Sequence, residues 1–153
     1  MARAGFYVIR GSEIRFGRDG RWYADGQVIT NPRIADLFAR HVRRRPEGGY
    51  MLRIADEQAP ILVEDTPYVV TAAELHPDGT LWVELNDRTR EPLDPGTLRV
   101  GVGDVLYCSV KGGREPARFL RPAYYQIARY ISAAEPDTFV LRSPRGDHPI
   151  ARR

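Results

Sequence analysis

A repeated pattern constrains the fold of this chain more than any other feature of its sequence. The stretch 121–142, RPAYYQIARYISAAEPDTFVLR, predicts a short helix that leads into a β-strand, and an imperfect copy precedes it. Pro32 and Pro122 lie 90 positions apart, as do Pro46 and Pro136, and residues 50–53, YMLR, match residues 139–142, FVLR, at 89. Each matched position has its own mechanical role, so the pattern predicts two equivalent units.

The first helix has a clear start and an apolar face. Asn31 can cap free backbone amides, and proline is tolerated at the first helical position. The apolar face is formed at spacings of i, i+3, i+4 and i+8 by Ile34, Leu37, Phe38 and Val42. We expect this helix to run into the arginines at 43–45 and to stop at Pro46.

The second helix is predicted to start at Pro122. Its apolar stripe would consist of Tyr124, Ile127, Ala128 and Ile131.

The remaining pattern predicts strands and tight turns. Asp25-Gly26 is a hairpin signal within 21–29, and 76–80, HPDGT, is a turn between strands at 68–75 and 81–85. Further strands are expected at 5–16, 50–54, 61–64, 105–110, 118–120 and 139–141, with a polar tail at 143–153 that holds one short strand at 149–150. The order favours an α+β fold: duplicated units of antiparallel strands with one helix each, rather than a doubly wound parallel sheet.

At 153 residues the chain has the size of one domain or two small half-domains. We expect an N-terminal repeat unit over 1–64, a connecting β-meander over 65–104 and a C-terminal repeat unit over 105–153. These parts are expected to pack as one globular body.

The composition favours a cytoplasmic protein with no membrane attachment. No apolar run approaches the roughly 18 residues that span a bilayer. The first residues lack the apolar core of a secretory signal. The single cysteine, Cys108, cannot form an internal disulfide, which agrees with a reducing compartment.

Charge divides the chain into thirds. Residues 1–53 carry 11 basic and 5 acidic groups, residues 54–105 carry 3 and 11, and residues 106–153 carry 9 and 4. The two basic thirds contain the repeated pattern, and the acidic third lies between them. Of the basic residues, 22 are arginine and only Lys111 is lysine.

No pattern predicts an enzyme, a cofactor or a metal site. His41, His76 and His148 have no metal-ligand spacing, and there is no nucleophile motif of the G-x-S-x-G kind. Cys108 on a predicted strand is interpreted as a small core residue. Residues 111–114, KGGR, lack the spacing of a phosphate loop and are interpreted as a hairpin turn.

Arg53 and Arg142 hold equivalent places at the ends of equivalent strands. If the halves pack symmetrically, both would face the junction. There they would either hold an anionic ligand or pair internally with carboxylates. The sequence leaves both alternatives open, and the carboxylates considered are Glu64, Asp65, Glu84 and Asp87.

Residues 12 to 142 resemble a bacterial family called domain of unknown function 1285. The most specific segments are 64–68, EDTPY, and 121–125, RPAYY. The resemblance implies a duplicated α+β fold whose C-terminal half is similar to pleckstrin-homology domains. It also implies a cleft between the halves that holds a nucleotide-like ligand in a signalling setting, and it favours Asp65 and Tyr68 as lining residues.

We therefore predict a non-enzymatic cytoplasmic regulatory domain that binds a small anionic, nucleotide-like ligand at the junction of its halves. The predicted ligand-binding residues are Arg53, Asp65, Tyr68, Asn86, Arg88, Arg118, Arg121, Tyr124 and Arg142. The alternatives are a protein-interaction module without a small ligand and a weak nucleic-acid binder, which rests only on the basic thirds.

Overall fold

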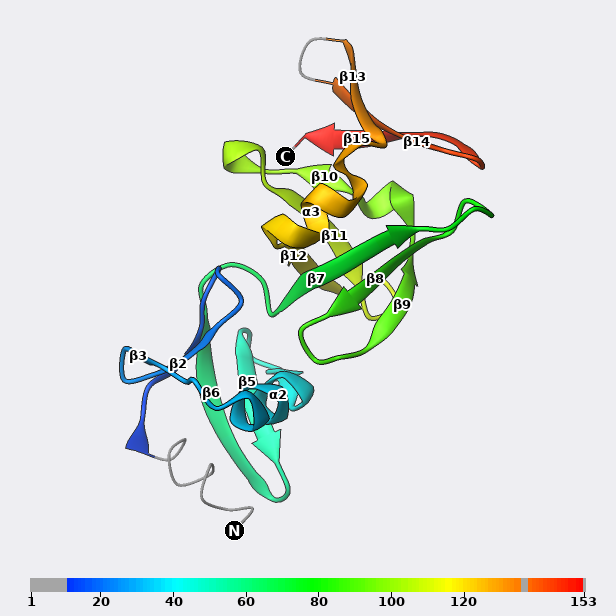
Figure 1. The fold of residues 1–153 in the computed structure, drawn as a ribbon. Coiled ribbons are helices and arrows are strands. Elements are labelled where there is room, and N and C mark those ends of the chain that lie inside the picture. The colour runs from blue at the N-terminus through cyan, green and yellow to red at the C-terminus, as the bar shows by residue number, and fades with distance from the viewer. Residues whose placement is uncertain (1–10, 136–137, 153) are drawn as a thin grey trace. The chain divides into compact units, whose positions relative to one another are not determined.

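A computed structural model describes residues 11–135 and 138–152 of the chain. The chain divides into two compact units, Met1–Pro67 and Tyr68–Arg153. The described residues are mostly β-strand with two α-helices, which is an α+β fold (Figure 1). The sequence predicted antiparallel sheets, but each unit contains a mixed sheet because some pairs of neighbouring strands run parallel.

The first unit contains a six-stranded sheet in the order β3-β2-β1-β6-β5-β4. Its strands are β1 (Ile14–Phe16), β2 (Trp22–Ala24), β3 (Gln27–Val28), β4 (Val42–Arg44), β5 (Tyr50–Ile54) and β6 (Glu57–Val63). Strands β1 and β6 are parallel. The hairpin predicted at Asp25-Gly26 is confirmed, since both residues adopt positive φ between β2 and β3.

Helix α2 (Pro32–Arg40) begins as predicted. The Asn31 side chain accepts a hydrogen bond from the backbone N of Arg33 at 2.9 Å. The predicted C-terminal end was wrong, because the helix stops at Arg40 and Val42 begins strand β4, opposite Leu52. The apolar residue at i+8, Val42, fits either a longer helix or a strand. It forms a strand here because it pairs with the distant strand β5.

The second unit contains a nine-stranded sheet in the order β13-β14-β15-β10-β11-β12-β7-β8-β9. Its strands are β7 (Tyr68–Leu75), β8 (Leu81–Leu85), β9 (Arg90–Leu93), β10 (Arg99–Val100), β11 (Leu106–Val110), β12 (Glu115–Phe119), β13 (Ile131–Glu135), β14 (Thr138–Ser143) and β15 (Gly146–Arg152). Short 3₁₀ turns η1 (Pro95–Thr97) and η2 (Val102–Asp104) flank β10. Strands β7 to β9, which the sequence assigned to a connecting meander, continue this sheet beyond β12.

Helix α3 (Arg121–Ala128) has Pro122 in its first turn, as predicted. Ile131 was assigned to the helix face, but it starts strand β13 opposite Leu141. Neither helix in the described part of the chain is long and apolar enough to cross a membrane.

The predicted polar tail was the largest error in the strand assignment. Residues 143–153 were expected to hold one short strand at 149–150, whereas β15 covers Gly146–Arg152 and forms a long antiparallel hairpin with the predicted strand β14. Strand β15 also pairs in parallel with β10, so it lies inside the sheet. Ile150 is buried there despite its polar sequence neighbours, because inward and outward side chains alternate along a strand.

Six of the nine strands in the second unit repeat the strand order of the first unit. In the first, β1 to β6 with α2 between β3 and β4 give β3-β2-β1-β6-β5-β4. In the second, β10 to β15 with α3 between β12 and β13 give β12-β11-β10-β15-β14-β13. The register agrees as well: Val42 faces Leu52 as Ile131 faces Leu141, so the matched residues lie 89 positions apart.

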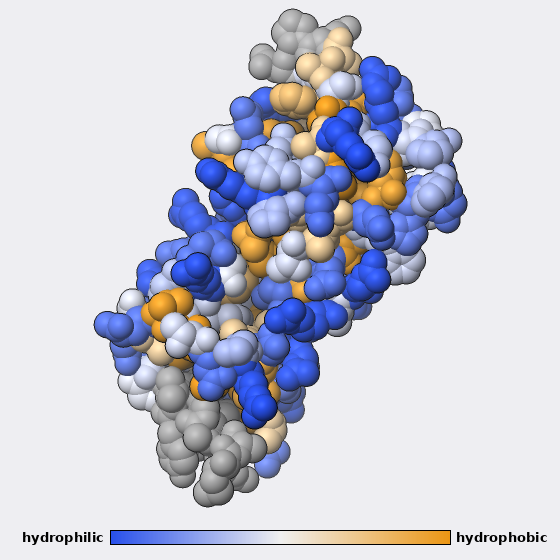
Figure 2. Space-filling model, viewed as in Figure 1, coloured by the Kyte–Doolittle hydropathy of each residue, from blue (hydrophilic) through white to orange (hydrophobic). Residues whose placement is uncertain are grey.

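Each unit has its own apolar core. In the first unit the rings of Phe16, Trp22 and Phe38 pack together, with centroids 4.7 and 5.4 Å apart. In the second unit the core includes Leu85, Cys108, Ile127 and Leu141. Figure 2 shows hydrophilic residues over much of the visible face, with hydrophobic residues in separate patches.

Candidate functional site

A pocket of about 370 Å³ in the second unit contains three of the predicted ligand-binding residues. Its walls come from the η2 turn, the start of β11, the end of β12 and the start of α3. The lining residues are Gly103, Asp104, Val105, Leu106, Arg118, Phe119, Arg121, Tyr124 and Tyr125. We call this the arginine pocket.

Alternation along β12 determines the direction of Arg118. Ala117 and Phe119 are buried on the core side, so Arg118 between them points to the opposite face. Its Nη1 donates a long hydrogen bond of 3.5 Å to the hydroxyl of Tyr107, which faces it on β11. The neighbouring strand therefore helps to orient one guanidinium group of the pocket.

Arg121 contributes the second guanidinium group. It is the first residue of α3, directly after β12, and its side chain is exposed. Within the described residues it has no hydrogen-bond or ion-pair partner. A cation with unused donors beside a second arginine suits a ligand that carries negative charge.

Two tyrosines of α3 supply the aromatic wall. Tyr124 follows Arg121 by three positions, so the two side chains lie on the same side of the helix. The rings of Tyr124 and Tyr125 are 5.8 Å apart between centroids and inclined by 57°. Tyr125 is 66% exposed, so most of its ring is available for contact.

The one carboxylate in the pocket is engaged. Asp104 Oδ1 accepts from Arg152 Nη2 at 3.2 Å, across to strand β15. This ion pair offsets the charge of Asp104, so Asp104 opposes an anion in the pocket less strongly.

A second cluster contains Tyr68, Asn86 and Arg88, at the start of β7 and in the turn between β8 and β9. Asn86 Oδ1 accepts from the backbone N of Val69 at 3.1 Å, which ties this turn to β7. Tyr68 is buried beneath Lys111, whose Nζ lies 5.0 Å from the ring centroid. Arg88 is exposed and has φ +70°, a turn conformation.

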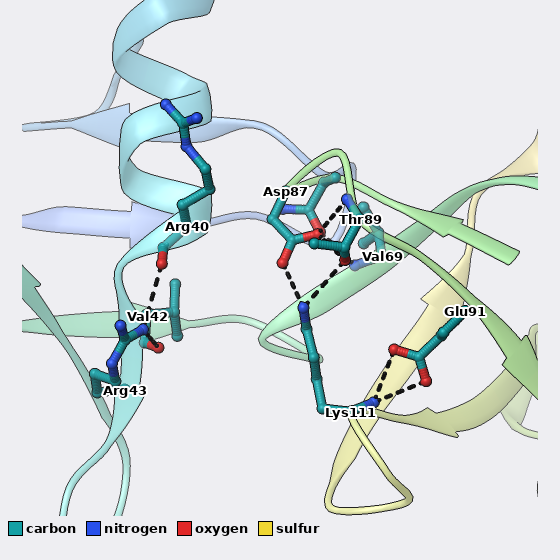
Figure 3. Close-up of polar contacts among 9 residues, drawn as sticks. Arg40, Val42, Arg43, Val69, Asp87, Thr89, Glu91 and Lys111 are labelled. Atoms are coloured by element: carbon teal, nitrogen blue, oxygen red, sulfur yellow. Dashed lines mark hydrogen bonds and ion pairs between the residues drawn. The ribbon is translucent and has the colours of Figure 1, made fainter.

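Lys111 forms hydrogen bonds with three residues next to this second cluster (Figure 3). Its Nζ donates to Asp87 Oδ2 and to Thr89 Oγ1, while its backbone N donates to both carboxylate oxygens of Glu91. Burial raises the pKa of Asp87, but hydrogen bonds from Lys111 and Thr89 outweigh it, and the net pKa lies below the ordinary value. The cluster joins the β8–β9 turn to the β11–β12 turn.

The remaining predicted residues lie elsewhere. Arg142 on β14 donates to Asp147 Oδ2 at 2.8 Å and to Ser132 Oγ at 2.9 Å, so it pairs with a carboxylate that the sequence analysis did not consider. Arg53 is exposed on β5, and Asp65 is partly buried between β6 and β7; both belong to the first unit. Glu64, one of the carboxylates considered for Arg53, instead pairs with Arg15 at 3.3 Å.

Sequence reasoning missed Tyr107, Tyr125, Asp104 and the role of Lys111. The pair Tyr124-Tyr125 directly after a predicted helix start was a usable signal for the aromatic wall. Tyr107 could not be found locally, because it meets Arg118 only through the β11–β12 register.

The described residues hold no cluster of three or more His, Cys, Asp or Glu side chains that could bind a metal ion. Cys108 lies in the core, as predicted, and burial raises the pKa of its thiol to about 12. The turn predicted at 111–114 is confirmed, with positive φ at Lys111, Gly112 and Gly113. The geometry of this chain is therefore that of an α+β protein with a cationic, aromatic pocket in its second unit.

Two solved structures have this fold. A DUF1285 family protein from Silicibacter pomeroyi DSS-3 matches 91% of this chain and 79% of its own length, with 22% identity and a TM-score of 0.70. A second, from Shewanella baltica OS155, matches 77% of this chain and 91% of its own, with 21% identity and a TM-score of 0.61. No protein-family model matches the sequence, and no curated protein matches it either. In its fold the chain is a DUF1285-like domain, as the sequence resemblance implied.

Proposed function

We propose that this protein is a cytoplasmic regulatory domain, not an enzyme, that binds a small anionic, nucleotide-like ligand in the arginine pocket. The observation that carries the proposal is the convergence of Arg118, Arg121, Tyr124 and Tyr125 on one cavity of about 370 Å³. That volume falls in the range of roughly 300–1,000 Å³ that small-molecule sites occupy.

The chemistry of the lining favours an anion with a planar part. Guanidinium groups bind phosphate or carboxylate through paired N–H donors. Tyrosine rings offer flat apolar surface to a planar ring system. A ligand with a phosphate and a base would use both, which is why we favour a nucleotide over a simple inorganic anion.

The proposal keeps only three of the nine residues that the sequence predicted to bind the ligand. Arg118, Arg121 and Tyr124 are retained as ligand contacts. Arg142 would contribute only if it left Asp147, and Asn86 and Tyr68 support the turn at Lys111. A ligand site at the junction of the halves stays a prediction from the sequence resemblance.

Thermal unfolding with added ligand tests the proposal. Inorganic phosphate, ADP and GDP would be added in turn to the wild type and to Arg118→Gln and Arg121→Gln variants. A nucleotide that binds should raise the melting temperature in proportion to ligand excess over Kd. Each substitution should weaken binding about tenfold, the loss expected for one charged hydrogen bond of roughly 1.5 kcal/mol.

Arg114→Gln is the matched control. Arg114 is an exposed arginine whose Nε donates to the carbonyl of Lys111 in the β11–β12 turn, outside the pocket. This variant should bind as the wild type does. If no anion raises the melting temperature, or if the pocket variants bind as well as Arg114→Gln, the proposal is wrong.

The protein-interaction module and the weak nucleic-acid binder stay as alternatives. If a protein partner raises the melting temperature while no small anion does, the first alternative replaces the proposal. Binding to a mixed oligonucleotide that weakens steeply with salt would favour the second.

We also infer that the chain arose by internal duplication of a unit of six strands and one helix. The shared strand order and the offset of 89 between the matched pairs of β4 to β6 and β13 to β15 support this origin. The similarity of the C-terminal half to pleckstrin-homology domains stays a prediction.

A further inference from the structure

A second cavity of the second unit is larger than the arginine pocket and has a different chemistry. This groove has a volume of about 580 Å³ and lies between the outer face of strands β7 to β9 and helix α3. Its lining residues are Ala72, Ala73, Glu74, Leu75, Trp82, Val83, Glu84, Arg90, Tyr125, Gln126, Arg129 and Tyr130. We call it the glutamate groove.

The strand register places the polar wall of the groove. Ala72 faces Glu84 and Glu74 faces Trp82 across β7 and β8, so these four side chains lie on one face of the sheet. The alternate residues of β8, Leu81 among them, point into the core. The small side chain of Ala72 leaves room above the sheet beside Glu84.

Helix α3 forms the opposite wall. Strand β7 pairs with β12 only through Val70, and beyond that point the Gln126 side chain accepts from the backbone N of Ala73 at 2.8 Å. This bond fixes α3 beside β7 and places Tyr125 and Tyr130 along the groove.

Four charged residues line the groove, and two of them, Glu74 and Arg90, pair with each other. Glu74 Oε1 contacts Nε2 of His76 at 2.8 Å and Nη2 of Arg90 at 3.9 Å. Arg129 Nη2 donates to the hydroxyl of Tyr130 at 2.8 Å. In the described part of the chain, the Glu84 carboxylate has neither a hydrogen bond nor an ion pair, although Arg90 stands opposite it on β9.

We propose that the glutamate groove binds a small organic cation whose ammonium group pairs with Glu84. The Glu84 carboxylate has unused acceptors and supplies the charge that such an ion needs. Arg90 and Arg129 already lie over the rings of Trp82 and Tyr130, 5.9 and 4.9 Å from the ring centroids. The exposed ring of Tyr125 is therefore the aromatic surface left for the ligand cation. This site shares Tyr125 with the arginine pocket but differs from it in its charged residues and in ligand charge, and neither ligand is needed for the other to bind.

The two tryptophans of the chain give a direct measurement. Trp82 lines the groove, whereas Trp22 is 2% exposed in the core of the first unit. Protein labelled with fluorotryptophan would show two fluorine NMR signals, assigned with a Trp82→Phe variant. Titration with butylammonium should shift the Trp82 signal with a saturable dependence and leave the Trp22 signal in place.

Matched glutamate variants test the role of Glu84. Glu84→Gln should weaken butylammonium binding at least tenfold, because it removes the charge that pairs with the ligand. Glu74→Gln should weaken binding less than threefold, because His76 and Arg90 already engage Glu74. Unchanged positions of the Trp22 and Trp82 signals without ligand would show that both variants are folded.

Two further titrations separate the sources of the signal. Sodium butyrate reports ionic strength and the alkyl chain without the cation, and it should have no saturable effect. The tripeptide Gly-Lys-Gly presents the same ammonium on a peptide; weaker binding than butylammonium supports a free amine, and much tighter binding overturns the assignment to a free small molecule.

Three other results would overturn the proposal. The first is no saturable shift of Trp82 up to roughly 10 mM butylammonium, beyond the millimolar range of weak ligands. The second is equal binding by Glu84→Gln and the wild type. The third is an equal response to sodium butyrate.

Discussion

The ammonium of Lys111 lies 2.5 Å from Oδ2 of Asp87, and these side chains are 25% and 6% exposed respectively. Lys111 is the only lysine of the chain, and it joins two turns that are distant in sequence (Figure 3). A compact ammonium can donate to Asp87 and Thr89 at once, whereas the planar guanidinium of arginine has a different donor geometry.

Removal of the lysine charge should destabilise the second unit. Lys111→Met leaves the Asp87 carboxylate buried without its cation, and we expect a loss of about 2–3 kcal/mol, reduced from the value for fully buried pairs by the partial exposure of Lys111. Urea unfolding followed through the fluorine signal of Trp82 measures it. Arg33→Met, an exposed position on α2, is the control and should leave the Trp82 transition unchanged. A similar midpoint for both variants would contradict the prediction.

The Asp87 carboxyl group should make the stability of the second unit depend on pH. The pKa of Asp87 is lower in the folded protein than its ordinary value, so its ionised form stabilises the fold. This contribution is complete above the unfolded-state pKa of about 3.9 and is lost as the pH falls through the lower folded-state pKa. Urea unfolding of the wild type between neutral pH and acid should show it.

Asp87→Asn is the control for that experiment. It removes the titrating group, so the stability of the second unit should fall less steeply with acid than in the wild type. Parallel pH profiles for the two proteins would mean that Asp87 does not carry this dependence.

Matched core truncations should act on different units. Leu52 and Leu141 occupy equivalent positions opposite Val42 and Ile131, and both are fully buried. Replacement of either by alanine should cost about 2–5 kcal/mol through lost burial and a residual cavity. Leu52→Ala should lower the unfolding midpoint of the Trp22 signal, and Leu141→Ala that of the Trp82 signal. The reverse assignment would contradict the division into units at 67/68.

Replacement of Gly101 or of Gly103 by alanine should destabilise the second unit, for a different reason at each position. A Cβ at Gly101 would lie 2.6 Å from Cε2 of Tyr107, so Gly101→Ala must displace this ring, whose hydroxyl accepts a hydrogen bond from Arg118. We expect overpacking of about 1–3 kcal/mol together with weaker anion binding in the arginine pocket. Thermal unfolding and nucleotide titration of the variant measure both effects.

A Cβ added at Gly103 would have no atom within 4 Å, but the φ angle of this residue is +72°. Gly103→Ala should therefore cost about 1 kcal/mol in backbone strain and leave Tyr107 and Arg118 in place. Gly103 also lines the arginine pocket, so the comparison of the two variants uses thermal unfolding alone. An equal fall in melting temperature would contradict the larger cost expected for the clash at Gly101.

Local signals predicted the starts of elements better than their ends. Asn31 with Pro32, and Pro122, marked both helix starts, since capping and proline geometry act within a few residues. Val42 and Ile131 were wrongly placed on helices, because strands β4 and β13 exist only through pairing with Leu52 and Leu141. The strand predicted at 149–150 was too short for the same reason: the alternating pattern of the tail is weak, and β15 is stabilised by two neighbouring strands.

The candidate site was predictable only in part. Arg118, Arg121 and Tyr124 are close in sequence, so a helix start was enough to group them. The contacts of Arg142 with Asp147, of Lys111 with Asp87 and of Tyr107 with Arg118 depend on sheet register. No local pattern contains that information.

Parallel pairing with a distant strand governs when each sheet can close during synthesis. Arg15 of β1 pairs with Leu62 of β6, 47 positions later, and Arg99 of β10 pairs with Ala151 of β15, 52 positions later. Contacts between distant residues form slowly, and an unpaired β1 or β10 edge invites association with other chains meanwhile. Translation of this chain therefore leaves an open strand edge in each unit until β6 and β15 have been synthesised.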